Sequence, residues 1–504
     1  MTSPVTAGDA ASAERDSKAG TVANRISTEQ ARAGVRSELA QNTLGLWGVL
    51  MQGIATIAPA FAIVSTFVFT VNLAGLAAPV AYLLAGAMLL PQAVSVNQLA
   101  KAFPSAGGWY TWIARSLHPR AGFFAGWYMT LWLPFAPALV FSYLASTVLM
   151  PAVLTQYGIT IPVWLWAVAG IGLIAWTAYR GIKVSERVLI ITGLTEMAIM
   201  VALAISGLIS PGPGGFNLAP FNPYNVPNSG TLFLAVVFSI FAYSGWEAVA
   251  PLAEESKDPR RNVPLGLLGS VIAMILFLAF TVWGYLIGIG TDAVGSIPTA
   301  EQFPVFTLAT RLWGSFWIFA PLAMLNSALA ATAACFNGGT RTWYGMARSG
   351  SLPSALAKVD PKRKTPDNAI HLMLGLQLVG GLLCGLFGSA AVFPTWALTL
   401  TLGLIVMYIL ANLGVIKYYL TEARSEFNVL THLVFPVLST MAMVYVGYKS
   451  VWPLPDPPAR YAIFFFVAYT ALGGAILAYL KSRGREDWLD KAGQAMEQTE
   501  RGEV

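Results

Sequence analysis

Two short stretches interrupt long apolar segments and decide the fold: Gln52-Gly53-Ile54-Ala55-Thr56-Ile57-Ala58-Pro59-Ala60 and Phe241-Ala242-Tyr243-Ser244-Gly245-Trp246-Glu247. Pro59 has no backbone N–H, and its ring clashes with the preceding turn of a helix. Gly245 removes side-chain restraint from the backbone close to the carboxylate of Glu247. Each stretch therefore predicts a helix that is interrupted near its middle, with a simple kink as the alternative.

The composition around these stretches is that of a membrane protein. Of the 504 residues, 56% are hydrophobic and 11% are charged, whereas charged residues make up about 25% of a typical soluble domain. A water-soluble enzyme is therefore excluded, and the lipid bilayer is the expected partner. The net charge of +6 does not indicate nucleic-acid binding, because the position of charges matters more than their sum in a membrane protein. Cys335 and Cys384 lie in apolar stretches, so neither a disulfide framework nor a Cys/His metal site is expected.

Twelve apolar stretches lie between two polar ends. Residues 1–40 predict a disordered cytoplasmic tail without a signal peptide, and residues 481–504 predict a cytoplasmic C-terminal tail. Each apolar stretch is long enough to cross a bilayer, where a helix satisfies its backbone hydrogen bonds. The predicted spans cover about residues 43–70, 76–100, 121–150, 161–179, 188–209, 231–253, 264–289, 312–340, 369–388, 391–416, 427–448 and 461–480.

The positions of lysine and arginine predict the orientation of these spans. Twelve spans place 27 of the 30 basic residues on the side of the termini and only Arg311, Lys449 and Arg460 on the other side. Basic residues are concentrated in cytoplasmic loops. The sequence therefore predicts a multi-pass protein of the cell membrane with both termini in the cytoplasm.

The two interrupted spans are equivalent if the chain contains two five-helix halves of opposite orientation. In a transporter domain of residues 41–480, the halves cover about 43–209 and 231–416, and two additional helices cover about 427–480. Interrupted helices at equivalent positions of inverted repeats indicate a transport site near the middle of the bilayer. Their peptide groups can bind a carboxylate at the N-terminal end of one half-helix and an ammonium group at the C-terminal end of another.

Two carboxylates are predicted to lie inside the membrane. Of the 24 acidic residues, only Glu196 in span five and Glu247 in span six fall within the predicted spans. An intramembrane carboxylate costs about 2.5 to 3.5 kcal/mol on insertion scales and marks a proton, ion or substrate path. A hydrogen-bonded structural role is the alternative for both residues.

Three further blocks of sequence are informative because of their order. They are residues 98–110 (QLAKAFPSAGGWY), Gly245-Trp246-Glu247 continuing through residues 254–264 (EESKDPRRNVP), and residues 341–353 (RTWYGMARSGSLP) followed by 364–366 (KTP). In this order, and with this topology, they resemble the amino acid, polyamine and organocation transporter superfamily. The resemblance implies an all-α membrane protein with a five-plus-five inverted repeat, alternating access, and a substrate held between the interruptions of spans one and six.

The resemblance also implies roles for individual residues. Carbonyls that accept the substrate ammonium group are implied near Phe241, Ala242 and Ser244. Amides that bind the substrate carboxylate are implied around Ile57, Ala58 and Ala60. Tyr243 and Trp246 are implied to shape the side-chain pocket, Glu247 to lie at the hinge of the second half-helix, and Thr56 and Gly245 to belong to the binding stretches.

These observations favour secondary active transport of an amino acid as the small-molecule substrate. Members of the superfamily commonly carry Gly-Ser-Gly or Gly-Ala-Gly at the first interruption, whereas this chain has Thr56-Ile57-Ala58-Pro59-Ala60. Because Pro59 lacks an amide, a permease or exchanger for a carboxylate-free amine or polyamine is the alternative, although few acidic groups are present to hold several positive charges. A nutrient sensor or channel-like protein that binds without net transport is a third interpretation.

The sequence leaves the coupling ion open between a proton and sodium, with exchange as a further alternative. Members of this fold can carry a lysine in span five in place of a sodium ion, whereas Glu196 is the only ionisable group there in this chain. Sodium would need oxygen ligands, and the candidates in span eight are Asn326, Ser327 and Thr332.

The last two predictions concern a gate and the absence of enzymatic activity. Arg341 beside Glu254 or Glu255 predicts a gate at the inner ends of spans eight and six. No motif for ATP binding or hydrolysis occurs, so neither an enzyme nor a cofactor is expected. The sequence makes no prediction of the oligomeric state.

Overall fold

The computed structural model describes residues 38–144, 158, 162–227, 229–296, 304–387, 389–484 and 486–493. Most of the predicted N-terminal tail and the last residues of the C-terminal tail lie outside this part of the chain. Within it, the secondary structure is helical, and the only β-type pairing is an isolated bridge between Leu44 and Ser256. The predicted all-α fold is confirmed for these residues.

Each predicted apolar stretch overlaps at least one helix. The first part of the chain contains α2 (Leu46–Ile57), α3 (Pro59–Ala74), α4 (Ala78–Ala102), α5 (Trp109–Ser116), α6 (Pro119–Tyr143), α7 (Val163–Tyr179) and α8 (Ile182–Ile209). The second part contains α9 (Ser229–Phe241), the 3₁₀ helix η6 (Trp246–Glu255), α10 (Pro259–Ile289), α11 (Pro304–Trp313), α12 (Phe319–Ser349), α13 (Asp367–Phe387), α14 (Ser389–Thr421), α15 (Phe435–Val451), α16 (Tyr461–Ser482) and the short α17 (Trp488–Lys491). Eight helical stretches of the described residues are long and apolar enough to cross a membrane.

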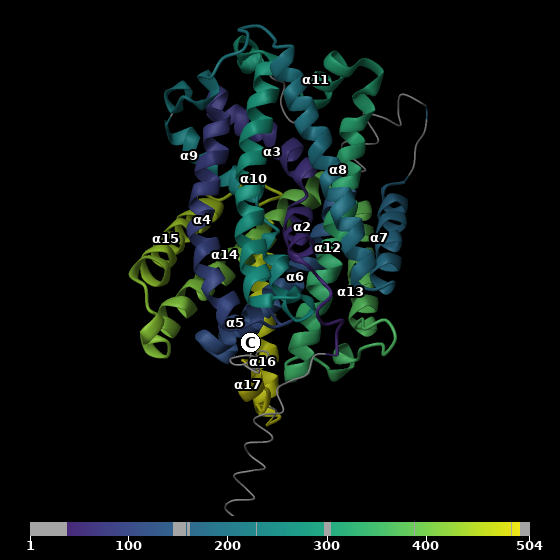
Figure 1. Ribbon diagram of the computed structural model, residues 1–504, viewed down its shortest axis with the longest axis vertical. Helices are drawn as coiled ribbons and strands as arrows, with labels where there is room; N and C mark the ends of the chain where they lie inside the picture. Colours follow the sequence, from purple (N-terminus) through teal and green to yellow (C-terminus); the bar gives the residue numbers. More distant parts are fainter. Residues whose placement is uncertain are drawn as a thin grey trace, which may run out of the picture.

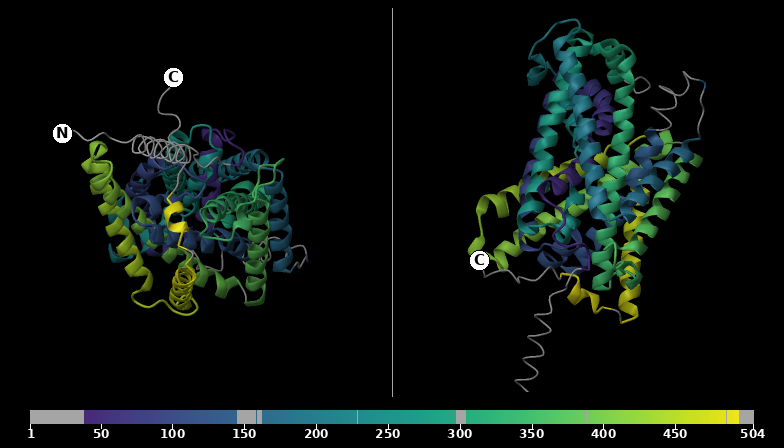
Figure 2. Two further views of the ribbon diagram at one scale, coloured as in Figure 1. Left: turned by 90° about the horizontal axis from the view of Figure 1, so that it is seen from below. Right: turned by 45° about the vertical axis from the view of Figure 1, so that its right-hand side comes forward.

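Helices α4, α8, α10 and α12 run along the long axis of the molecule, with α2 and α3 in the middle of the bundle (Figure 1). Helices α8, α10 and α12 surround this pair and pack against it. Helices α15 and α16 stand at the outside of the bundle, as two further views show (Figure 2). Large apolar side chains of α16 are exposed, among them Phe464, Phe465 and Leu472. Exposed apolar side chains on outer helices are expected of a protein that lies in lipid.

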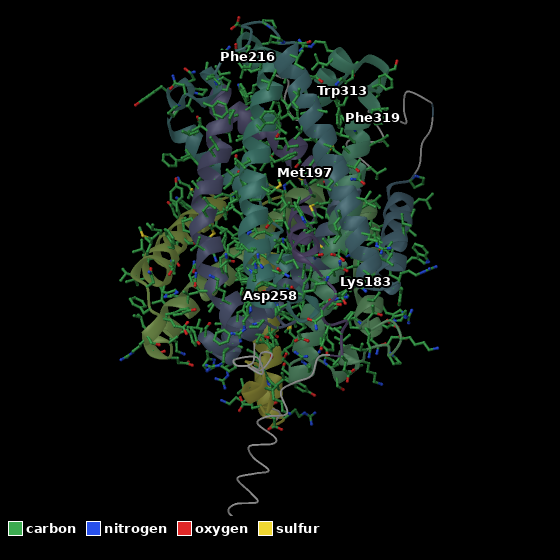
Figure 3. The ribbon with its side chains drawn as sticks, viewed as in Figure 1. Lys183, Met197, Phe216, Asp258, Trp313 and Phe319 are labelled. Atoms are coloured by element: carbon green, nitrogen blue, oxygen red, sulfur yellow. The ribbon has the colours of Figure 1, made fainter. Side chains whose placement is uncertain are left out.

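The two ends of the bundle carry different loops. Lys183 and Asp258 lie toward one end, and Phe216, Trp313 and Phe319 lie toward the opposite end (Figure 3). Helix α17 lies at the first of these ends (Figure 1). Lys183 and Asp258 belong to two different loops that the sequence predicts to be cytoplasmic, and these two loops lie toward the same end of the molecule (Figure 3).

The described part of the C-terminal tail is packed against the bundle. The side chain of Trp488 is buried, and its ring centroid lies 5.9 Å from that of Phe123 on α6. Glu486 forms an ion pair of 3.1 Å with Arg120. Residues 486–493 of the predicted tail are therefore packed against the bundle, with Trp488 as their apolar anchor.

Candidate functional site

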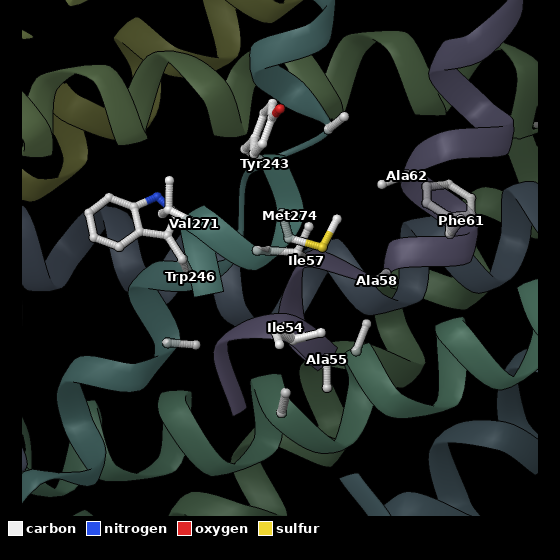
Figure 4. Close-up of a cluster of buried hydrophobic side chains, with 14 of the residues drawn as sticks. Ile54, Ala55, Ile57, Ala58, Phe61, Ala62, Tyr243, Trp246, Val271 and Met274 are labelled. Carbon is white, nitrogen blue, oxygen red and sulfur yellow. The ribbon is translucent and has the colours of Figure 1, made fainter. Parts of the chain in front are cut away.

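The first interruption lies where the sequence predicts it. Helix α2 ends at Ile57 and α3 begins at Pro59, with Ala58 between them in the left-handed region at φ 59° and ψ 69°. Proline is suited to the first position of a helix, because its fixed φ fits and its missing N–H needs no partner there. A non-glycine residue with positive φ is uncommon. The chain therefore changes direction at Ala58, which Figure 4 shows at the junction of the two helices.

The second interruption is longer and ends in a different kind of helix. Helix α9 ends at Phe241, and the backbone N–H groups of Ala242, Tyr243 and Ser244 each donate to a carbonyl three residues earlier. Gly245 has φ 132°, a conformation that L side chains rarely adopt. The second half of the span, residues 246–255, is a 3₁₀ helix, whereas the sequence predicts an ordinary half-helix. Both interruptions are confirmed.

The two interruptions are in direct contact through Gly245. A Cβ atom on Gly245 would lie 2.6 Å from the carbonyl carbon of Thr56 and from the nitrogen of Ile57. Real Cβ contacts of this length do not occur, so the backbone of the second interruption approaches that of the first only because this residue is glycine. The close approach brings the C-terminal ends of α2 and α9 to the same place.

A cavity of about 60 Å³, measured as the space open to the centres of water molecules, lies at this place. That space is sufficient for several waters or one small solute. Five predicted substrate-binding residues line it: Thr56, Ile57, Ala58, Phe241 and Ser244. The remaining lining residues are Phe61 and Ala62 of α3, Trp132, Ala136, Pro137 and Val140 of α6, Ala331 and Cys335 of α12, and Ala397 and Leu400 of α14. No lining residue is ionised at neutral pH, so the cavity is largely apolar.

The lining residues from α6, α12 and α14 are absent from the sequence predictions. Which face of a regular helix points inward depends on the rotation of that helix, and the apolar runs in these spans do not fix it. The only local signal is the presence of Pro134 and Pro137 within span three. Trp132 and Cys335 are therefore found by the structure alone.

The other five predicted substrate-binding residues lie beside the cavity without lining it: Ala60, Ala242, Tyr243, Gly245 and Trp246. The hydroxyl of Tyr243 donates to the carbonyl of Tyr82 on α4 at 2.8 Å, so this side chain points away from the cavity. Trp246 belongs to a buried aromatic cluster, in which its ring centroid lies 5.9 Å from those of Trp109 and Tyr408. The side chains of Tyr243 and Trp246 thus contact α4 and the aromatic cluster, and they fix the position of the second interruption.

Glu196 lies on α8 and is directed at the N-terminus of α3. Its side chain is buried, and its Oε2 atom accepts the backbone N–H of Ala60 at 3.3 Å. The next N–H, that of Phe61, donates to the hydroxyl of Ser327 at 3.3 Å. A helix N-terminus favours a carboxylate because its first N–H groups lack intrahelical partners. The amide of Ala60, which the resemblance assigns to the substrate carboxylate, is therefore used by a side chain of the protein.

Glu247 likewise accepts a backbone N–H group, at the second interruption. Its side chain is buried, and its Oε2 atom accepts the backbone N–H of Gly245 at 2.7 Å. Glu247 follows the first residue of η6 and so lies at the N-terminus of that helix. Within the described residues, the Oε1 atoms of both Glu196 and Glu247 are buried without a hydrogen-bond partner.

The side chains considered as sodium ligands already have hydrogen-bond partners in the protein. Asn326 donates to the carbonyl of Thr192 at 2.6 Å, and Thr332 donates to the carbonyl of Ala328 at 2.7 Å. Ser327 accepts the amide of Phe61, as described above. Among the described residues, no group of three or more His, Cys, Asp or Glu side chains could hold a metal ion.

Two ion pairs, one fully buried and one partly buried, join α12 to η6 toward the end that contains Asp258. Arg341 is 1% exposed and binds the fully buried Glu255 with two hydrogen bonds of 2.8 and 3.1 Å. Arg348, two helical turns further along α12, binds Glu254 at 2.5 and 3.0 Å. The predicted contact of Arg341 with one of these glutamates is confirmed, and the Arg348 pair is a further contact that the sequence prediction missed.

Backbone hydrogen bonds add further contacts at the same place. The N–H groups of Thr43 and Leu44 both donate to the carbonyl of Glu255 at 2.9 Å, and the N–H of Lys257 donates to the carbonyl of Leu44 at 2.9 Å. Oε1 of Glu254 accepts the N–H of Ala106 at 3.0 Å. The segment before α2, the end of η6, α12 and the loop before α5 are thus tied together.

A helical bundle with exposed apolar outer helices and a cavity where two interrupted helices meet is the architecture of a membrane transporter. The sequence matches the amino acid permease family over residues 48–479, so the chain belongs to that family. It is a transporter and not an enzyme, as the sequence predicts.

Three relatives illustrate the range of the family. The chain is 25% identical over 423 residues to the low-affinity putrescine importer PlaP of Escherichia coli, which covers 82% of this chain and 88% of the importer. It is 26% identical over 403 residues to the branched-chain amino acid permease BcaP of Bacillus subtilis, with 74% and 80% covered. It is 25% identical over 448 residues to cationic amino acid transporter 1 of Arabidopsis thaliana, with 85% and 72% covered.

Proposed function

We propose that this protein carries a small solute with an ammonium group, an amino acid or an amine, across the cell membrane by alternating access. The observation that supports the proposal is the cavity where the C-terminal ends of α2 and α9 meet. Helix C-termini carry a partial negative charge, which favours a cation. The membrane domain has twelve spans in two inverted halves with two additional helices, and both termini are cytoplasmic. The ion pairs of Arg341 with Glu255 and of Arg348 with Glu254 form the inner closure that opens during the cycle.

A labelling experiment tests whether the cavity is the substrate site. Cys335 lines the cavity and is buried, so in a Cys384→Ser background a small methanethiosulfonate reagent should modify it when the cavity opens during the cycle. A transported solute at about ten times its Kd should slow this reaction about tenfold, because only about a tenth of the sites stay empty. The measurement is the labelling rate of the purified protein with and without the solute.

Gly474→Cys in a cysteine-free background is the matched control for labelling. This position lies on the outer helix α16, and nothing lies within 4 Å of a Cβ built there. Its labelling rate should not respond to the solute. A transported solute that leaves Cys335 equally reactive would contradict the assignment of the cavity.

We further propose that Glu196 carries the coupling proton. The carboxylate is buried, bonds to the first turn of α3, and lies beside the interruption that moves in an alternating-access cycle. In proteoliposomes with a pH gradient of one unit, the wild type should accumulate the solute up to about tenfold, whereas Glu196→Gln should only equilibrate it. Glutamine keeps the oxygen that accepts the N–H of Ala60 but cannot exchange a proton.

Glu186→Gln is the control for coupling, because Glu186 lies on the same helix and is only half-buried. Accumulation by this variant should match the wild type. Unchanged proton-driven accumulation in Glu196→Gln would show that another group carries the proton. Accumulation driven by a sodium gradient, with no response to pH, would show that sodium is the coupling ion.

A further inference from the structure

A layer of uncharged polar side chains lies between the cavity and the ion pairs of the inner closure. On α2, Gln52 precedes Thr56 of the cavity by one helical turn, and on α12, Asn337 precedes Arg341 by one turn. Gln52 and Asn337 are hydrogen bonded to each other and at most 1% exposed. The inference drawn from this layer rests on the proposed function, because it concerns the inner path that the transport cycle opens.

The amide of Gln52 joins the inner halves of both interrupted spans to α12. Its Nε2 atom donates to the carbonyl of Ala334 on α12 at 2.7 Å and to the carbonyl of Ala248 on η6 at 3.4 Å. Its Oε1 atom accepts an N–H of the Asn337 side chain at 3.2 Å. One side chain of α2 thus connects three elements, and two of them belong to the interrupted spans.

The same elements approach each other closely at this depth because two residues are glycine. A Cβ atom on Gly53 of α2 would lie 2.9 Å from the side chain of Val249 on η6. A Cβ atom on Gly338 of α12 would lie 3.2 Å from the carbonyl oxygen of Ala248 on η6. The backbones of α2, η6 and α12 therefore leave little room for a solute beside the hydrogen bonds of Gln52.

A second set of hydrogen bonds in the layer does not involve α2. The Asn337 side chain donates to the hydroxyl of Ser185 on α8 at 3.0 Å, and this hydroxyl donates back to Oδ1 of Asn337 at 3.2 Å. Further along α12, Asn326 donates to the carbonyl of Thr192 on α8 at 2.6 Å. If α2 moves away, Asn337 and Ser185 still satisfy each other. Because an unsatisfied buried polar group is unfavourable, the layer separates more easily at Gln52 than between α8 and α12.

We propose that Gln52 is a positioning residue that holds the inner path closed below the cavity, and that this path opens by separation of Gln52 from Ala334, Ala248 and Asn337 while the pair of Asn337 with Ser185 stays intact. Gln52 does not line the cavity, so it controls access to the solute and not its recognition. None of these five residues is charged, and hydrogen bonds between neutral groups are weaker than those of an ion pair. The layer can therefore break and form again in every cycle.

The side of the membrane from which Cys335 can be labelled tests this proposal. A membrane-impermeant methanethiosulfonate reagent is applied to the Cys384→Ser protein in right-side-out and in inside-out membrane vesicles. Gln52→Leu keeps the approximate size of the side chain but removes all of its hydrogen bonds. Labelling in inside-out vesicles should therefore be at least about tenfold faster than in the parent protein, whereas labelling in right-side-out vesicles should not rise.

Two further variants make the test specific. Gln98→Leu is the matched control, because the amide of Gln98 donates to the carbonyl of Val94 on its own helix at 3.2 Å. Its labelling rate should equal that of the parent protein on both sides. Ser185→Ala leaves the hydrogen bonds of Gln52 in place and should also label at the parent rate. A rise from the inner side as large as that in Gln52→Leu would show that the layer opens as one unit, which overturns the proposed separation.

The remaining outcomes decide the role of Gln52. Equal labelling of Gln52→Leu and the parent protein on both sides overturns it. Faster labelling on both sides, together with a lower thermal transition, shows a general loosening and equally contradicts a positioning role. If Gln52→Leu does not fold, the unbranched Gln52→Met carries the same expectation. Protection of Cys335 by a transported solute is measured without any change at Gln52, so the proposed function can stand or fail independently.

Discussion

Replacing Arg341 by alanine is expected to destabilise the protein by about 3 to 5 kcal/mol, because a fully buried glutamate then loses its partner. Glu255 is 0% exposed and receives two hydrogen bonds from Arg341, and the guanidinium also donates to Thr340 at 3.0 Å. The thermal transition of the purified protein should fall, and uptake in proteoliposomes should be lost. The labelling rate of Cys335 from the inner side should rise in the fraction that stays folded, since one tie of the inner closure is removed.

Two controls separate the buried pair from a general effect of removing charge. Arg363→Ala removes a 42% exposed side chain from ion pairs with Asp360 and Asp367 and should change stability by less than about 1 kcal/mol. The double variant Arg341→Met with Glu255→Gln removes both charges and should recover most of the stability. Wild-type stability and uptake in Arg341→Ala would exclude the gate.

The same closure shows what sequence spacing can and cannot determine. Arg341 and Arg348 are seven residues apart, so they share one face of α12, and Glu254 and Glu255 are adjacent in the chain. This spacing allows two acids to meet two arginines, although the sequence prediction names Arg341 alone. It does not predict which acid meets which arginine, because that depends on the direction in which η6 presents its side chains, and η6 is a 3₁₀ helix.

The interruptions were predictable because their causes are local. Pro59 and Gly245 act on their own backbone. Helix α2 ends two residues before Pro59, and α9 ends four residues before Gly245. The left-handed conformation of Ala58 was not predictable, because alanine has no intrinsic preference for it. The contact between Gly245 and Thr56 holds the two interruptions together, and it belongs to the tertiary structure.

The lining of the cavity was predictable only in part, because some of its residues depend on local sequence and others on tertiary packing. Residues at the interruptions, such as Thr56 and Ser244, line it because the chain leaves the helix there. Trp132, Cys335 and Leu400 lie on regular helices, and only the packing of those helices turns them inward. The hydrogen bond of Glu196 was also not predictable, because nothing in the sequence of α8 indicates that this carboxylate accepts the N–H of Ala60.

Gly245→Ala is expected to abolish most transport, because the added Cβ has no space and the backbone conformation is unfavourable for alanine. The atom would lie 2.6 Å from Thr56 C and Ile57 N and 2.7 Å from the carbonyl oxygen of Thr56, all of which are backbone atoms that cannot rotate away. The backbone at φ 132° adds strain of about 1 to 3 kcal/mol for a residue with a side chain. At about 2 kcal/mol the transport-competent arrangement is populated about 30-fold less, so the initial uptake rate should fall by at least this factor.

The matched control for this prediction is Gly474→Ala on α16, where nothing lies within 4 Å of the new Cβ. Alanine in a helix is favoured over glycine by about 1 kcal/mol, so this variant should be as stable as the wild type or slightly more stable, with unchanged uptake. If Gly245→Ala kept wild-type uptake, the two interruptions would have to separate without functional effect, which contradicts a solute held by both. Loss of uptake with a preserved thermal transition would instead show that the close approach of Gly245 to Thr56 and Ile57 forms the site and does not merely support the fold.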